Sequence, residues 1–544
     1  MQPRIAQVMP ESSSRPPVAL FDRSAALVVL PLLALGLALR LIAMGREGFW
    51  IDEIYGASYT NLSFFETIVA CLRFDIHPPL YYLQLDAWSA LGHGDIWLML
   101  NSIAWGMATL VLVYVATARR YGVLAGRLAL TFCVVMGSEV YFAEELRMYT
   151  LFGFLVTLGW VLGNRLLADY RFRVATPLII VLAAVGALHS FGVVAVSAAL
   201  LFIFPRGERQ QISQRLPTWL AISALVGVLI LPWVANGLLR HVGHLQPLSV
   251  GDVAYTISGW LLGYRAIIQP EWVQISVTLL IALALLVAYR IAPELRRTIL
   301  CYLLWPLGVS AAICLLGKPV WIFRSFAFCA PLLAVCLGVL FAQLISMSQA
   351  RATPLVRRVC LVLLAAWICV GSALAYRIAT TPWKTQYREA AHYIQENARA
   401  GDIIYIPDHV TYWGVARYLV GPSWGSLLAV EDPINPDRSQ FWPGIYRRLG
   451  PNILQHLHLI PRTRRTDGFR APLYVGWTPL PEAKNAGVIW VVGLVHPPFV
   501  VFQLREVELC PYHDLRTRDF TELRVFRLQC DHDGSSSKLH PGSS

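Results

Sequence analysis

The chain has 544 residues, of which 56% are hydrophobic and only 14% are charged. A soluble domain carries about 25% charged residues, so this composition excludes an ordinary soluble protein, a disordered chain and a disulfide-rich secreted scaffold. The formal net charge of +12 would suggest nucleic acid in a soluble protein, but here most of the chain is expected to lie in lipid. We therefore expect a protein of the lipid bilayer that crosses it several times and binds no nucleic acid.

Apolar segments that approach the 20 or so residues needed to cross a bilayer recur along the chain. The run 177–204 carries no formal charge, and we expect it to form two short spans that meet near His189 and Ser190. The other nine expected spans are 25–43, 96–118, 123–141, 149–165, 219–234, 273–289, 299–316, 325–345 and 358–377.

Arginine placement sets the predicted orientation. With the N-terminal tail, residues 1–24, in the cytoplasm, every cytoplasmic segment holds three arginines, as in the connection 119–127. This is the positive-inside pattern of membrane proteins. It places 44–95 in a long outer loop, in which the stretch 79–92 is too short to cross and lies along the outer interface. We therefore expect about eleven spans within residues 25–377.

The composition changes at residue 378, and we expect 378–544 to form an outer α/β domain. Residues 383–400 have helical spacing with mixed charge, while 402–406 and 488–494 have the apolar pattern of buried strands. The proline-rich and glycine-rich stretch 422–481 is expected to form long loops. Cys510 and Cys530 stand apart from the apolar runs, and an oxidising compartment would let them form a disulfide.

Two adjacent acids, Asp52 and Glu53, follow the first span within Gly-Phe-Trp-Ile-Asp-Glu-Ile-Tyr. Neighbouring side chains point in different directions, so one acid can face a site while the other braces the loop. A carboxylate beside the apolar Trp50 suits a general base for an incoming hydroxyl. A solvated pair of loop acids is the alternative, and the residue types alone do not decide between the two.

A second charged group, which contains Glu144, Glu145 and Arg147, lies at the outer end of a predicted span. One of these acids can position a substrate, and Arg147 can hold a phosphate through two N–H donors. The alternative is a Glu–Arg pair that neutralises itself within the loop. The excess of acids over arginine favours a functional role.

Three more residues can meet an anion at the outer face. His77 precedes Pro78 and Pro79, which we expect to start an interfacial helix whose N-terminus attracts anions. A structural cap with an incidental histidine is the equal alternative. Lys318 and Arg324 lie in a short outer turn, where they suit a lipid-linked phosphate or act as snorkelling anchors to lipid headgroups.

We predict neither a metal site nor a cofactor. His241 and His244 have the i, i+3 spacing that lets two side chains touch a divalent ion, but two histidines are weak evidence for one. The sequence contains no CxxC pair, no P-loop and no GxGxxG fingerprint. A divalent ion is therefore left open and is not expected.

Three motifs on the same predicted face resemble those of the membrane-embedded GT-C glycosyltransferases. They are W-x-D-E-x-Y in the first outer loop, then H-P-P-L-Y-Y, then E-x-R-M-Y after the third span. The resemblance covers roughly residues 25–330. It is nearest to a bacterial branch that includes protein O-mannosyltransferases, lipid A aminoarabinose transferases and rhizobial galacturonosyltransferases. It implies an all-α polytopic GT-C fold, followed here by the outer α/β domain.

The resemblance also implies roles for individual residues. Asp52 matches the family's catalytic carboxylate, and Glu145 is the best match to its second acid, although Glu144 beside it leaves that choice open. Arg147 and Tyr149 complete the motif.

The residue before the double proline is histidine in the mannosyltransferases and lysine in the aminoarabinose transferases, so His77 matches the former. The family places basic residues near the donor phosphate, which suits Arg147, Lys318 and Arg324 together with His77.

The implied function is transfer of a sugar, with inversion, from a polyprenyl-phosphate donor on the periplasmic side of a bacterial inner membrane. Asp52 and Glu145 would be catalytic, with Glu53, Glu144 and Tyr149 in support. The acceptor would be lipid A or lipopolysaccharide, another cell-envelope glycan, or a protein. A transporter, flippase or polymerase for lipid-linked glycans is the alternative. Transporters, however, place ionisable residues near the bilayer midplane within repeated halves, and here the acids lie in outer loops.

Overall fold

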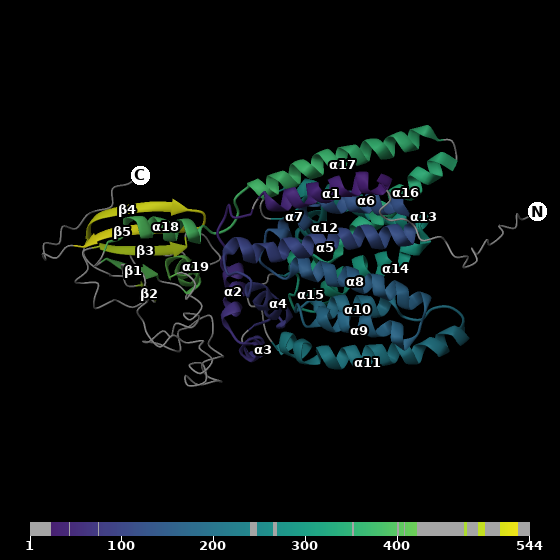
Figure 1. Ribbon diagram of the computed structural model, residues 1–544, viewed down its shortest axis with the longest axis horizontal. Coiled ribbons are helices and arrows are strands. Elements are labelled where there is room, and N and C mark those ends of the chain that lie inside the picture. The colour runs from purple at the N-terminus through teal and green to yellow at the C-terminus, as the bar shows by residue number, and fades with distance from the viewer. Residues whose placement is uncertain are drawn as a thin grey trace, which may run out of the picture.

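The computed structural model describes residues 23–42, 44–73, 75–239, 247–264, 269–350, 353–399, 402–406, 409–420, 473–475, 488–494 and 512–530. Long helices run side by side in a bundle, and the strands gather beyond one end of it (Figure 1). His241, His244 and Cys510 lie outside the described residues, so the expectations for them stay predictions.

Apolar helices account for the bundle. The long ones are α5 (Asp95–Tyr121), α8 (Tyr149–Ala168), α11 (Arg209–Leu239), α13 (Glu271–Ile291), α16 (Cys329–Ala350) and α17 (Pro354–Thr380), with a run from η2 (Pro293–Leu295) through α14 (Arg296–Thr298) and the π-helical η3 (Ile299–Leu304) to α15 (Trp305–Leu315). Within the described residues, seven helices are long and apolar enough to cross a membrane, or eight if a bent pair is one span.

The bent pair is α6 (Val123–Val134) and α7 (Gly137–Ala143), which meet at 58°. The shorter apolar helices are α1 (Arg23–Leu41), α9 (Phe172–Gly186) and α10 (Gly192–Phe202). The run 177–204 is thus interrupted at His189 and Ser190, as predicted. All eleven predicted segments are helical, while the number that cross the membrane stays a prediction.

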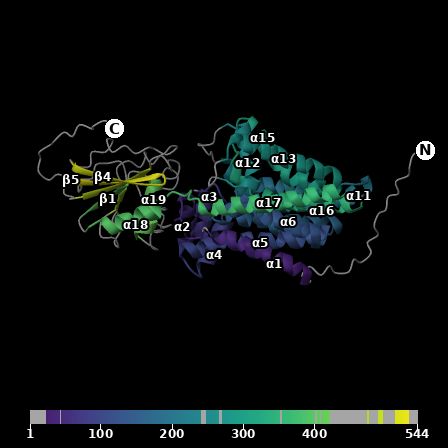
Figure 2. The same ribbon diagram turned by 90° about the horizontal axis from the view of Figure 1, so that it is seen from above.

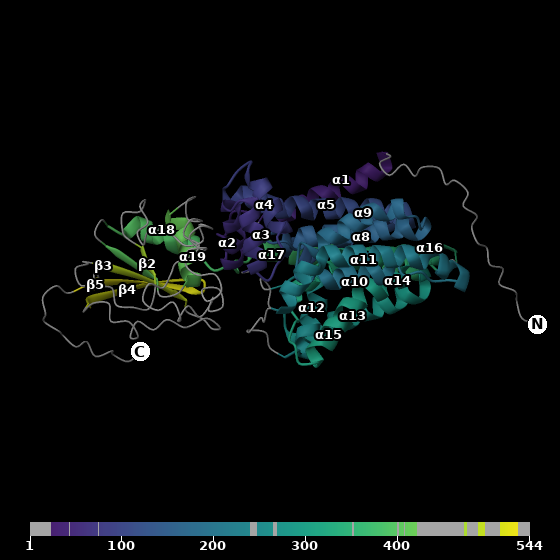
Figure 3. The ribbon, with the colours of Figure 1, turned by 90° about the horizontal axis from the view of Figure 1, so that it is seen from below.

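Short helices of the first outer loop cover the end of the bundle that faces the strands. They are α2 (Ile51–Ser58), η1 (Tyr59–Asn61), α3 (Phe64–Arg73) and α4 (Leu80–Ser89), the last being the predicted interfacial helix. In Figure 2 and Figure 3, as in Figure 1, α2 lies between the long helices and the strand-containing part. The loops predicted to be outer also contain α12 (Val250–Leu262) and η4 (Phe323–Phe326).

Beyond α17 the described chain forms two helices and a sheet. The helices are α18 (Tyr387–Asn397) and α19 (His409–Val420), and the strands are β1 (Ile403–Ile406), β2 (Leu473–Val475), β3 (Val488–Leu494), β4 (Tyr512–Phe520) and β5 (Leu523–Cys530). The sheet order is β2-β1-β3-β5-β4, with β1 parallel to both of its neighbours and the other pairs antiparallel.

The helix expected over 383–400 is α18, and the two expected strands are β1 and β3. The exception is β2, a strand inside the stretch expected to be loop. The last long helix ends at Thr380, close to the predicted domain boundary, which itself stays a prediction.

Candidate functional site

The first residues of α2 carry the two adjacent acids. Trp50 precedes the helix, and its backbone N–H donates to Glu53 Oε2 at 3.0 Å. The Glu53 side chain thus supplies an acceptor for an N–H at the helix start, which has no carbonyl partner within the helix. Both acids lie in the first turn, where the helix dipole favours negative charge. The sequence thus places two carboxylates at one helix start without a basic residue beside them.

Asp52 and Glu53 occupy different environments. The Asp52 side chain is 29% exposed, and its Oδ2 accepts a hydrogen bond from Arg324 Nη1 at 2.8 Å. The Arg324 side chain is 20% exposed, and its guanidinium lies over the Trp50 ring. Glu53 is fully buried. One acid faces the accessible side and the other faces inward, while their roles in a reaction stay a prediction.

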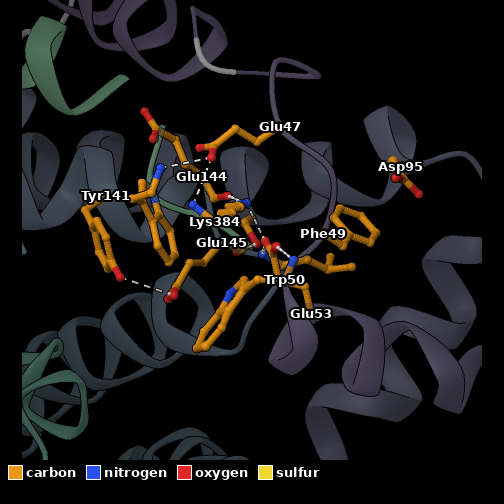
Figure 4. Close-up of polar contacts among 12 residues, drawn as sticks. Glu47, Phe49, Trp50, Glu53, Asp95, Tyr141, Glu144, Glu145 and Lys384 are labelled. Carbon is orange, nitrogen blue, oxygen red and sulfur yellow. Dashed lines mark hydrogen bonds and ion pairs between the residues drawn. The ribbon is translucent and has the colours of Figure 1, made fainter. Parts of the chain in front are cut away.

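Glu53 joins three distant segments. Its Oε1 accepts from Leu146 N–H at 2.8 Å and from Lys384 Nζ at 2.7 Å, in addition to the Trp50 bond. The same Lys384 ammonium donates to the Glu144 carbonyl at 2.7 Å. Figure 4 shows Lys384 among Glu47, Glu53 and Glu144. The sequence reasoning missed Lys384 and Glu47, although the rarity of lysine in this chain was a usable signal.

The structure separates Glu144 from Glu145. Glu144 is buried toward Lys384 and Glu47, and its Oε1 has no hydrogen-bond partner among the described residues. Desolvation raises the pKa of Glu144 to about 8, against the attraction of Lys384. Glu145 Oε1 instead accepts from the Tyr141 hydroxyl at 3.4 Å. The Glu145 charge also interacts with Arg324 and Tyr149, which places it on the Asp52 side.

Arg147 is buried beneath α2. Its Nη1 donates to the Asp52 backbone carbonyl at 3.0 Å, and its Nε has no hydrogen-bond partner among the described residues. Among the described residues, the Arg147 guanidinium therefore bonds α2 and not a glutamate of its own loop. This contact argues against a Glu–Arg pair that merely neutralises itself.

His77 lies against a second histidine. The His77 and His189 rings are 4.7 Å apart, and the His189 ring is 5.9 Å from that of Tyr149. Burial, helped by His189 and nearby arginines, lowers the pKa of His77, and burial likewise lowers that of His189 to about 3. His77 is therefore neutral at pH 7 and can offer a phosphate a hydrogen bond but no charge.

Asp75 organises the turn before His77. Its carboxylate accepts from the Tyr59 hydroxyl at 3.1 Å, the Tyr82 hydroxyl at 2.6 Å and the His77 backbone N–H at 2.9 Å. The Tyr59 and Tyr82 rings stack at 3.9 Å. This buried network fixes the two prolines and the start of α4 relative to α2.

The predicted cations of the outer turn differ in placement. Arg324 pairs with Asp52, whereas Lys318 is exposed. Within the described residues no group of three or more His, Cys, Asp or Glu side chains could hold a metal ion. The structure thus brings together six predicted site residues, which are Asp52, Glu53, Glu144, Glu145, Arg147 and Arg324. The rings of Tyr149 and His77 lie beside them, and each contacts the ring of His189.

No family model matches the sequence, and no match is found among curated proteins. Solved structures do match. ArnT from Cupriavidus metallidurans in the apo state superposes with a TM-score of 0.55 at 12% identity, over 93% of this chain and 98% of ArnT. ArnT bound to undecaprenyl phosphate gives a TM-score of 0.53 at 11% identity, over 94% of this chain and 99% of ArnT.

The oligosaccharyltransferase of Archaeoglobus fulgidus gives a TM-score of 0.46 at 12% identity, over 71% of this chain. The match covers 61% of that longer protein. The GT-C fold predicted from the three outer motifs is confirmed by the ArnT superpositions over nearly the whole of both chains. The chain therefore has the fold of the GT-C membrane glycosyltransferases.

Proposed function

We propose that the protein is an inverting membrane glycosyltransferase that takes a sugar from a polyprenyl-phosphate donor. The observation that carries this proposal is the partly exposed Asp52–Arg324 pair, set on buried Glu53 at one end of a GT-C bundle. An acid beside a cation suits a reaction in which one substrate loses a proton and the other releases an anion. The binding of undecaprenyl phosphate by ArnT, a protein of the same fold, supports a lipid-linked donor.

Asp52 acts as general base in this proposal. The acceptor hydroxyl oxygen attacks the anomeric carbon of the sugar as the bond from that carbon to the phosphate oxygen breaks. The hydroxyl proton passes to the Asp52 carboxylate, and the bonding electrons leave with polyprenyl phosphate. Attack opposite to the leaving group inverts the sugar carbon. If the acceptor is itself a phosphate, no base is needed and Asp52 positions the acceptor.

The departing phosphate is stabilised by arginine. Arg324 has N–H donors beyond the one that it gives to Asp52, and the buried Arg147 Nε has no partner among the described residues. Neutral His77 adds a hydrogen bond, and exposed Lys318 attracts the headgroup from the rim of the site. Phosphate is a good leaving group with this support, so the reaction requires no general acid.

In this proposal Glu145 is the second acid, and Glu144 supports the loop that carries it. Glu145 shares the side of Arg324 and Tyr149, whereas Glu144 is turned toward Lys384 and Glu47. From there Glu145 holds the acceptor or orients Arg324. Tyr149 supports the site through its ring contact with His189.

The proposed setting is the periplasmic face of a bacterial inner membrane. The arginines of the inner connections support this orientation, and it places the site and the α/β part outside the cytoplasm. The proposed acceptor is a periplasmic glycan, a lipid such as lipid A, or a protein.

The test is a transfer assay in nanodiscs that compares wild type with Asp52→Asn. Radiolabelled polyprenyl-phosphate sugars are the donors, and a membrane lipid and glycan extract supplies acceptors. Wild type should move label, and Asp52→Asn should lose at least about 100-fold in rate, as expected for removal of a general base. Asp519→Asn, which removes an exposed carboxylate on β4, is the matched control.

The outcomes separate two parts of the proposal. Transfer that survives in Asp52→Asn would keep the enzyme class and remove Asp52 as the base. A folded wild-type protein that transfers none of the sugars offered would favour a carrier of lipid-linked glycans.

A further inference from the structure

Glu53 is held by hydrogen bonds from three parts of the chain. The Trp50 N–H is local, the Leu146 N–H belongs to the loop after α7, and Lys384 belongs to the segment between α17 and α18. Glu53 has no exposed surface and the Lys384 side chain is 3% exposed, so this ion pair is sealed from water. A buried pair of this kind is costly unless its remaining donors and acceptors are also satisfied.

Lys384 uses a second of its three N–H donors within the protein. Its Nζ donates to the Glu144 carbonyl, so one ammonium ties α2 to the loop that carries Glu145 and Arg147. Glu47 Oε1 accepts from the Trp383 and Lys384 backbone N–H groups at 2.9 and 2.8 Å, which fixes the lysine backbone to the stretch before α2. Figure 4 shows these dashed contacts converging on Lys384.

The residues next to these contacts are those of the proposed chemistry. Asp52 precedes Glu53, and Arg147 follows Leu146 and donates to the Asp52 carbonyl. The Asp52 backbone is therefore held on one side by Arg147 and on the other by the Glu53–Lys384 pair. A shift of α2 relative to the loop would move the Asp52 carboxylate away from its place beside Arg324.

We propose that Lys384 is a positioning residue that acts through Glu53 to hold Asp52 in register with Arg147 and Arg324. The inference rests on the proposed function for its kinetic consequences but on the contacts above for its geometry. The segment after the last long helix thus completes the site, although Lys384 touches neither substrate.

Removal of the ammonium would leave the buried Glu53 carboxylate with two backbone donors and no countercharge. Misplacement of a catalytic group by about 1 Å can cost about 100-fold in rate. Binding of the donor phosphate uses the guanidinium groups of Arg147 and Arg324, which bond Asp52 and not Lys384 or Glu53, so it should change less than the placement of the Asp52 carboxylate. We therefore expect kcat to fall about 10- to 100-fold in Lys384→Gln, with the donor KM changed by less than about threefold.

The experiment combines the wild type with Lys384→Gln, Lys384→Arg, Glu53→Gln and Glu53→Gln/Lys384→Gln, all as full chains in nanodiscs. Arg524→Gln is the matched control, because Arg524 pairs with Asp519 at an exposed position of the β4–β5 hairpin. Each protein is assayed for kcat and donor KM. Hydrogen exchange is measured over the peptides 47–55 and 143–148, in which the two amides that bind Glu53, those of Trp50 and Leu146, lie beyond the first two residues.

Four results support the proposal. Lys384→Gln should lose kcat and keep its donor KM, Lys384→Arg should retain more activity than Lys384→Gln, and the double variant should lose no more than the worse single variant. Such non-additivity is the mark of two residues that act as one unit. Both peptides should exchange faster in Lys384→Gln than in Arg524→Gln.

Two results overturn it. One is a folded Lys384→Gln with the wild-type kcat, and the other is losses in kcat that multiply in the double variant. If Lys384→Gln does not fold, the double variant replaces it, because it leaves no unpaired buried charge. A wild-type kcat in the double variant would then overturn the proposal, and a loss of about 10- to 100-fold would support it. A wild type that transfers no sugar would refute the proposed function alone, since hydrogen exchange still reports whether Lys384 holds the two peptides.

Discussion

Arg147 combines two features at the scale of a single residue. One guanidinium nitrogen fixes the carbonyl of Asp52, while Nε is buried with no partner among the described residues. An unsatisfied buried donor costs about 1–3 kcal/mol, and a charged donor costs more. The cost is recovered if an anion binds there. Arg147 thus holds α2 and keeps a buried donor that the proposed function assigns to phosphate.

Arg147→Ala should weaken binding of undecaprenyl phosphate by at least about tenfold, because charge-assisted hydrogen bonds are worth about 1.5–3 kcal/mol. Arg46→Ala removes an exposed arginine of the same outer face and should change the affinity less than about twofold. Titration of the lipid into each purified variant measures both. Equal losses would place the phosphate elsewhere.

Glu144 should make stability depend on pH. Burial raises its pKa to about 8 in the folded protein, from an ordinary value of 4.5, so folding favours the protonated carboxyl. That contribution is complete below about pH 4.5 and is lost as the pH rises through about 8, by an amount on the order of a few kcal/mol. Glu144→Gln cannot ionise. Between about pH 5 and pH 9, its thermal midpoint should therefore fall less than that of the wild type.

Glu396→Gln, at an exposed position of α18, is the control and should follow the wild-type curve. Glu53, which is also buried, is common to all three proteins, so its own contribution cancels in the comparison. Parallel curves for wild type and Glu144→Gln would show that Glu144 does not titrate in this range.

The sequence motifs identified the acids and arginines of the site but not their partners. Asp52, Glu145 and Arg147 were found because charged residues beside apolar spans are costly and therefore informative. Lys384 was missed because its meaning depends on a contact with Glu53, 331 residues earlier in the chain. No local pattern encodes a pairing over such a separation.

At the scale of elements, the break between α6 and α7 sets the direction of the loop that contains residues 144–147. Arg40 of α1 donates to the Val134 carbonyl at this break. After the break, α7 packs directly on the end of α12, where Ser138 Oγ donates to the Trp260 carbonyl at 2.8 Å. Gly137 makes this possible, because a Cβ there would lie 2.4 Å from the Gly263 nitrogen.

Gly137→Ala should therefore displace α7 from α12 and lower both thermal stability and transfer activity. The clash is with backbone, which cannot move aside as a side chain can, so we expect a loss of about 1–3 kcal/mol. Thermal unfolding in detergent measures it. Gly308→Ala on α15, where a Cβ would meet nothing within 4 Å, should be neutral or slightly stabilising. Equal midpoints for the two variants would refute the close approach.

Elements were predicted well where hydrophobicity alone decides them. The apolar runs indicated all eleven bundle segments, and Pro78 and Pro79 marked the start of α4. The helix α12 was not anticipated, because it is short and lies in a loop region without the length of a span. The 58° bend at α7 was also missed, since it depends on the fit of Gly137 against another helix.

At the scale of the whole molecule, α19 packs against the end of the bundle that carries the candidate site. The Tyr418 hydroxyl donates to Asp95 Oδ2 at 2.8 Å and accepts from the Phe49 N–H at 2.7 Å, and Arg417 pairs with Asp95. The Trp413 ring stacks on Tyr55 of α2 at 5.9 Å. The region after α17 thus contacts both the stretch before α2 and the start of α5.

Tyr418→Phe should loosen this contact without unfolding either part. It leaves the Phe49 N–H without its acceptor, so hydrogen exchange over residues 48–52 should accelerate, and limited proteolysis between α17 and α18 should become faster. Tyr376→Phe, which removes a hydroxyl from an exposed position of α17, is the control. Unchanged exchange in Tyr418→Phe would mean that α19 does not restrain α2.

The long separation between α2 and its restraints has a consequence for synthesis. Glu53 cannot pair until a lysine 331 residues later has been synthesised, and the Phe49 N–H has no acceptor until a tyrosine 369 residues later has been synthesised. At about 5–20 residues per second, this interval lasts on the order of tens of seconds. During that time α2 lacks both restraints, and Asp52 is held only by residues of the bundle such as Arg147 and Arg324. On the proposed function, a chain truncated before Lys384 should therefore transfer sugar more slowly than the full chain, and full activity should begin only after translation has passed α19.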